Sequence, residues 1–127
     1  MIINPPIHAA YVFDMLAIFG IKMVKTSGEL YIQSSKNYSD LKAYLCERLG
    51  NEEYSQIVRS DAYAKLYQAN IEVFNRIDEI KVRGEQLGDA TYIDQKNYDR
   101  YLAKKALQEK FFPDSVFNEQ KIGYNKL

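Results

Sequence analysis

The sequence predicts an all-α domain of four main helices and one short helix at residues 1–112, followed by a C-terminal tail at residues 113–127. Apolar residues recur at spacings of three and four over most of the chain, which is the helical period. Capping and helix-breaking residues divide the chain into segments of helical length. The 127 residues, 46% of them hydrophobic, are enough to bury one core without disulfides or metals.

The first predicted helix follows Asn4-Pro5-Pro6 and ends at Lys25. Asn4 suits the N-cap, and Pro5 suits the first turn because it lacks an N–H. The apolar residues, which cover more than half of the circumference, are Ala9, Val12, Phe13, Leu16, Ala17, Phe19, Met23 and Val24. The polar arc holds His8, Asp14, Lys22 and Lys25. Such a helix is expected at the centre of the bundle rather than in a membrane, because its apolar run is short and contains a carboxylate.

The second predicted helix runs from Thr26 to Leu49, with Gly50 just past its end. Thr26 and Glu29 have the spacing of a capping box. Its apolar stripe consists of Tyr31, Tyr38, Leu41, Leu45 and Leu49. The competing interpretation is a β-hairpin that pairs residues 21–25 with residues 29–33. The stripe favours the helix because it continues well beyond the hairpin.

Asn51 is a candidate cap for a short helix, and Ser60 is a candidate cap for the longest helix, which reaches about Val82. The seam of the long helix consists of Tyr63, Leu66, Asn70, Val73, Ile77 and Ile80. One asparagine in a coiled-coil seam can pair between two copies and fix the oligomeric state. Alternatively, Asn70 hydrogen-bonds within the monomer, for example to a tyrosine hydroxyl. The sequence leaves both interpretations open.

A polar loop at residues 83–90 separates this helix from the last one, which is predicted to begin near Thr91 or Asp94 and to end at Phe112. A basic stripe on the last helix consists of Lys96, Arg100 and Lys104, with Tyr98 and Tyr101 in the same helix. Such a stripe can hold a nucleic-acid backbone while tyrosines stack on bases. A solvated face is favoured, because 17 acidic residues balance 17 basic ones and give no overall attraction to nucleic acid. An acidic protein partner would use the same residues.

The sequence offers few groups for catalysis or metal binding. His8 is the one histidine and Cys46 the one cysteine, and neither has the neighbours that a nucleophile or a metal site needs. Glu72 and Asp78 share a helix face, but Asn75 interrupts the acidic pattern. Ion pairs of Glu72 with Arg76 and of Glu79 with Arg83 are expected on a solvated face. No catalytic residue, cofactor or metal is predicted.

The expected function is therefore non-enzymatic: self-assembly or binding of a partner protein through tyrosine-rich helical surfaces. The eleven tyrosines favour this interpretation, since tyrosine is enriched in interfaces. The candidate interface residues are Tyr63, Leu66, Asn70, Val73, Ile77, Tyr98, Arg100, Tyr101 and Lys104. A tyrosine-lined pocket for a small molecule or nucleotide is the first alternative, and nucleic-acid binding through the last helix is the second. One cysteine allows no intrachain disulfide, which favours the reducing cytoplasm.

Overall fold

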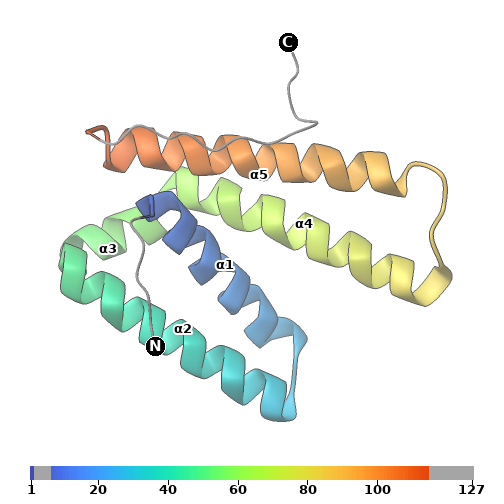
Figure 1. The fold of residues 1–127 in the computed structure, drawn as a ribbon, viewed down its shortest axis with the longest axis horizontal. Helices are drawn as coiled ribbons and strands as arrows, with labels where there is room; N and C mark the ends of the chain where they lie inside the picture. The colour runs from blue at the N-terminus through green and yellow to red at the C-terminus, as the bar shows by residue number, and fades with distance from the viewer. Residues whose placement is uncertain (2–6, 115–127) are drawn as a thin grey trace.

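The computed structural model describes residue 1 and residues 7–114, and these residues form five helices and no strand (Figure 1). The helices are α1 (Ala9–Lys25), α2 (Gly28–Leu49), α3 (Asn51–Val58), α4 (Asp61–Arg83) and α5 (Asp89–Phe111). The predicted all-α fold with four main helices and one short helix is thereby confirmed. The alternative hairpin at residues 21–33 is wrong, since α1 and α2 occupy that segment.

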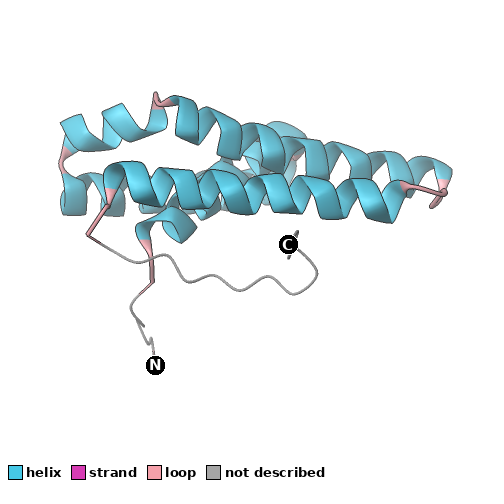
Figure 2. Ribbon diagram, turned by 90° about the horizontal axis from the view of Figure 1, so that it is seen from above, coloured by secondary structure: helices cyan, strands magenta, loops and turns pink. Residues whose placement is uncertain are grey.

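Helix α1 is at the centre of the arrangement, because it contacts α2, α4 and α5. Helices α4 and α5 form a long hairpin whose members lie side by side (Figures 1 and 2). Helix α2 packs against α1 and α3, and α3 connects it to α4. The helix with the most apolar sequence therefore packs against three other helices, as its wide apolar arc predicts.

The core forms where α1 meets the other helices. Its buried members are Ala10, Phe13, Leu16, Leu45, Tyr54, Ile57, Leu66, Ala103 and Leu107. Phe13 lies at its centre, with its ring centroid 6.4 Å from that of Tyr54 and 6.2 Å from that of Tyr63. None of the helices among the described residues has the length and apolarity that crossing a membrane requires.

Local chemistry explains several helix ends. Ser60 caps α4 as predicted, and its Oγ accepts a hydrogen bond from the backbone N–H of Tyr63 at 3.1 Å. Gly50 ends α2 with a φ of 89°, a conformation that favours glycine. Asn51 is the first residue of α3 rather than its cap.

Two predicted helix starts are wrong. Thr26 does not cap α2, because its hydroxyl donates a hydrogen bond back to the carbonyl of Lys22 and α2 begins at Gly28. Helix α5 begins at Asp89, before Thr91, because the Asp89 carboxylate is held by the preceding loop and by α4. The predicted cap at Asn4 and most of the predicted tail, residues 115–127, lie outside the described residues.

Candidate functional site

The most concentrated group of buried polar side chains lies where α1 meets α4 and α5, around the carboxylate of Asp14. Asn70 of α4 donates a hydrogen bond to Asp14 Oδ1 at 2.8 Å. Arg100 of α5 donates from Nε to Asp14 Oδ1 at 3.0 Å and also from Nη2 to Oδ2. Asp14 is only 4% exposed. Asp14, which the sequence places on the polar arc of α1, is therefore buried against α4 and α5.

Within the basic stripe of α5, Arg100 and Lys104 face α1, whereas Lys96 faces α4. Lys104 is 2% exposed, and its Nζ lies 4.0 Å from Asp14 Oδ2 and 4.7 Å from the centroid of the Tyr11 ring. Lys96 pairs with Glu72 of α4 and lies 3.7 Å from the Asp99 carboxylate. The interpretation of the stripe as a solvated face is wrong for Lys104. A long cation is buried here because a carboxylate and an aromatic ring surround its charge.

Two further contacts join α1 to the other helices. At its start, the backbone N–H of Ala10 donates to Oε1 of the buried Gln108 at 3.0 Å, which satisfies one of the free N–H groups of the first turn. At its end, Nζ of Lys25 donates to the side-chain oxygens of Asn75 and Asp78, each at 2.7 Å. The start, middle and end of α1 are thus each held by a polar contact to α4 or α5.

The polar seam residue Asn70 forms its hydrogen bonds within the chain. It is 2% exposed, and its amide nitrogen donates to Asp14 Oδ1 and, at 3.0 Å, to the carbonyl of Leu66. The side-chain partner of Asn70 is therefore the Asp14 carboxylate and not a tyrosine hydroxyl. Leu66 is fully buried, so this part of the seam packs inside the monomer.

The remaining interface candidates are distributed over several environments. Tyr63 packs against the Phe13 ring, and burial raises the pKa of its hydroxyl above the ordinary value. Tyr98 and Tyr101 are half-buried with ring centroids 6.2 Å apart. Val73 is half-buried and Ile77 is exposed. The nine candidates therefore do not form one common surface.

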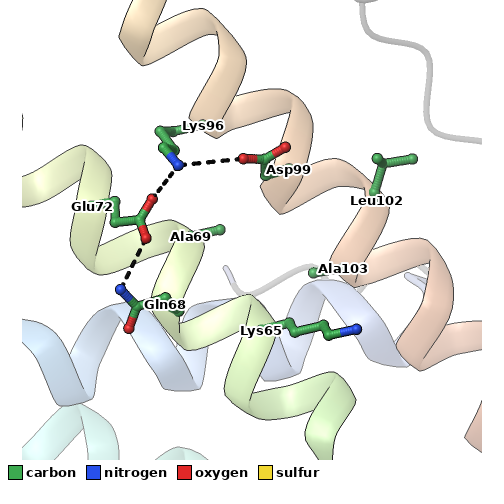
Figure 3. Close-up of a pocket in the computed structure, with 8 residues that line it drawn as sticks. All are labelled: Lys65, Gln68, Ala69, Glu72, Lys96, Asp99, Leu102 and Ala103. Atoms are coloured by element: carbon green, nitrogen blue, oxygen red, sulfur yellow. Dashed lines mark hydrogen bonds and ion pairs between the residues drawn. The ribbon is translucent and has the colours of Figure 1, made fainter.

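A shallow groove of about 270 Å³ lies between α4 and α5 (Figure 3). Its lining residues are Lys65, Gln68, Ala69, Glu72, Lys96, Asp99, Leu102 and Ala103. Lys96 crosses one end and joins Glu72 to Asp99 (Figure 3). This groove contains no tyrosine, so it is not the tyrosine-lined pocket of the ligand-binding hypothesis.

A second ionic cluster, which the sequence did not predict, closes the α4–α5 loop. The buried Asp89 carboxylate accepts hydrogen bonds from Arg76, Arg83 and the backbone N–H of Gln86 at 2.7–3.0 Å. These donors, above all Arg83, hold the pKa of Asp89 well below its usual range. The guanidinium of Arg76 also stacks 3.7 Å from the centroid of the Tyr92 ring. The cluster fixes the start of α5.

The acidic face of α4 pairs differently from the prediction. Glu72 pairs with Lys96 rather than with Arg76, and this pairing lowers the pKa of Glu72. The expected contact between Glu79 and Arg83 is present at 3.9 Å. Cys46 is half-buried against the core. No group of three or more histidine, cysteine or acidic residues within the described part of the chain is placed to hold a metal ion.

The turn between α1 and α2 lies at the outer edge of the fold (Figure 1). Large apolar side chains near this turn are exposed. Val24 is 76% exposed, Leu30 69% and Ile32 66%. Tyr31, between the last two, is also exposed. We call these four residues the α1–α2 tip. Tyr44, which is also on α2 but outside the tip, is exposed as well.

Comparison with known protein families, with curated proteins and with solved structures gave no match.

Proposed function

We propose that this protein acts without catalysis, by binding a protein partner or another copy of itself through the α1–α2 tip. The observation that carries the proposal is the exposure of four large apolar side chains within nine residues. Single exposed apolar residues are ordinary on protein surfaces, whereas these four surround one turn of the chain, where one partner could cover them together. The balanced charge of the chain supports association, because like molecules do not repel each other strongly.

The α4 seam is a weaker candidate for the interface than the α1–α2 tip. Leu66 and Asn70 are buried, and Asn70 donates hydrogen bonds to Asp14 of α1 and to the Leu66 carbonyl of its own helix. Both residues therefore contribute to the fold of the monomer. On α2, Tyr31 and Tyr44 are exposed and retain the tyrosine character of the predicted interface. We place this activity in the reducing cytoplasm, where the half-buried Cys46 stays a thiol.

Sedimentation velocity over a range of protein concentrations tests the proposal. The variant Leu30→Glu/Ile32→Glu adds charge at the tip, and Val82→Glu/Leu87→Glu adds the same charge to exposed residues at the α4–α5 loop. We expect the wild type and the loop variant to associate as concentration rises, and the tip variant to stay monomeric. If the wild type is itself monomeric, the three proteins serve as baits in host lysate. The proposal then requires a protein that the wild type and the loop variant retain and that the tip variant loses. Identical behaviour of all three proteins in both assays contradicts it.

A further inference from the structure

We propose that the polar contacts between α1 and the α4–α5 hairpin are a register device: they select one rotation and one axial position of α1 that its apolar contacts alone do not determine. The central part of this device consists of Asp14, Asn70, Arg100 and Lys104, which we call the Asp14 network. This inference is independent of the proposed function, because it concerns contacts inside the monomer.

The apolar surface of α1 is too wide to fix the helix by itself. Its fully buried members are Ala10, Phe13, Leu16, Ala17 and Ile21, and its partly buried ones include Val12, Ile18, Phe19 and Met23. The hydrophobic attraction has no direction. Cores of suitable volume also tolerate alternative packing, and they lose a unique structure before they lose stability. A rotated α1 would therefore still bury a large apolar surface.

Two polar side chains of α1 that reach α4, in contrast, lie on one narrow stripe. Asp14 and Lys25 are eleven residues apart, which places them within about 20° of each other around the helix at 3.6 residues per turn. Both side chains reach α4, through Asn70 and through Asn75 with Asp78. A rotation of α1 would break both contacts together, although they lie at the middle and the end of the helix.

Sliding α1 along its axis is opposed as well. On α5, Arg100, Lys104 and Gln108 follow one another at intervals of four residues, and all three contact α1. A shift of α1 by one turn would place Ala10 or Ile18 where the Asp14 carboxylate now lies. Lys104, which is 2% exposed, would then lose this carboxylate in a place where water cannot replace it. Breaking a buried ion pair is strongly unfavourable, whereas replacing a whole buried ionic group by apolar residues is often tolerated.

That contrast provides the test. The quadruple variant Asp14→Leu/Asn70→Leu/Arg100→Met/Lys104→Met replaces all four side chains of the network with apolar ones. Spin labels are attached at Met15→Cys on α1 and Ala106→Cys on α5, both exposed positions, in a Cys46→Ser background. Pulsed electron paramagnetic resonance then measures the distribution of distances between the two helices. The control variant Lys36→Met/Asp40→Leu removes an exposed ion pair from α2.

We expect the wild type and the control to give one narrow distance. The quadruple variant should keep its helical circular dichroism and cooperative unfolding but give a broad or divided distribution, with displacements up to about one helical turn of 5.4 Å. A narrow distance at the wild-type value in the quadruple variant overturns the proposal, because the Asp14 network would then not be needed to set the register. If that variant does not fold, the triple variant that retains Asn70, whose amide still donates to the Leu66 carbonyl, is measured in its place. Failure of both variants to fold also overturns the proposal, because the network would then be required for stability itself.

Discussion

Replacing Asp14 with asparagine removes one negative charge from the buried network while leaving the shape of the side chain almost unchanged. The carboxylate now faces Arg100 and Lys104, whose side chains are 28% and 3% exposed. Removing one member of a buried ion pair typically costs 3–5 kcal/mol, because the remaining charge stays buried. Water can reach Arg100 in part, so we expect a loss near the lower end, about 3 kcal/mol. Small domains have about 5–15 kcal/mol of stability in total, so this loss is a large fraction.

Denaturant unfolding followed by circular dichroism measures this loss. Asp40→Asn is the matched control, because it makes the same chemical change in the exposed Lys36–Asp40 pair of α2. Exposed pairs contribute little to stability, so the control should unfold close to the wild type. A free energy of unfolding for Asp14→Asn that is indistinguishable from that of Asp40→Asn would refute the reasoning, since burial of the Asp14 carboxylate would then carry no energetic weight.

Four other predictions follow from single contacts. Asn70→Leu should sediment as the wild type does but unfold about 1–3 kcal/mol more easily, because the Asp14 carboxylate loses a donor; a higher melting temperature with an altered oligomeric state would instead place this residue in an interface between copies. Ser60→Ala should lower the free energy of unfolding by about 1 kcal/mol through loss of the α4 cap, and an unchanged value would show that the cap is not needed. Gly20→Ala should raise it by about 0.5–1 kcal/mol, because an added Cβ has its nearest neighbour at an ordinary 3.6 Å; a destabilised variant would reveal a clash. Asp89→Asn should be less stable than the wild type at neutral pH. Because folding lowers the pKa of Asp89, the difference should shrink as pH falls below about 4, the unfolded value; a pH-independent difference in chemical denaturation would contradict this.

Much of the secondary structure could be predicted from the sequence because its signals are local. The apolar period locates the helices, and Gly50 and Ser60 mark a helix end and a helix start at the residues where the structure has them. Thr26 shows the limit of such signals. Its hydroxyl has two possible backbone partners, and the end of α1 competes successfully with the start of α2 for it. A spacing rule that considers only the following helix cannot detect that competition.

The buried network could not be located in the same way. A helical period shows that Asp14 and Lys25 share a face, but not which element covers that face. Asp14 lies on an apolar helix, and Arg100 and Lys104 lie on another helix. Their opposite charges are consistent with the ion pairs that the structure shows. Predicting these pairs requires knowing that α1 packs against α5, and Asp14 and Arg100 are 86 positions apart in the sequence. The Asp89 cluster escapes prediction for a related reason: composition predicts a polar loop at residues 83–90 but does not show that Asp89 pairs with Arg76 and Arg83.

The position of α1 in the chain also has a consequence for the order of folding. Asp14 precedes Asn70 by 56 positions and Arg100 by 86, so a growing chain on the ribosome exposes α1 long before it contains their side chains. The hairpin of α1 and α2 can form early, but the Asp14 carboxylate must remain in water until α4 and α5 have been synthesised. The last step that buries Asp14 therefore joins distant parts of the sequence, and contacts of this kind are slow to form. During synthesis, the wide apolar arc of α1 is the surface on which a chaperone would act.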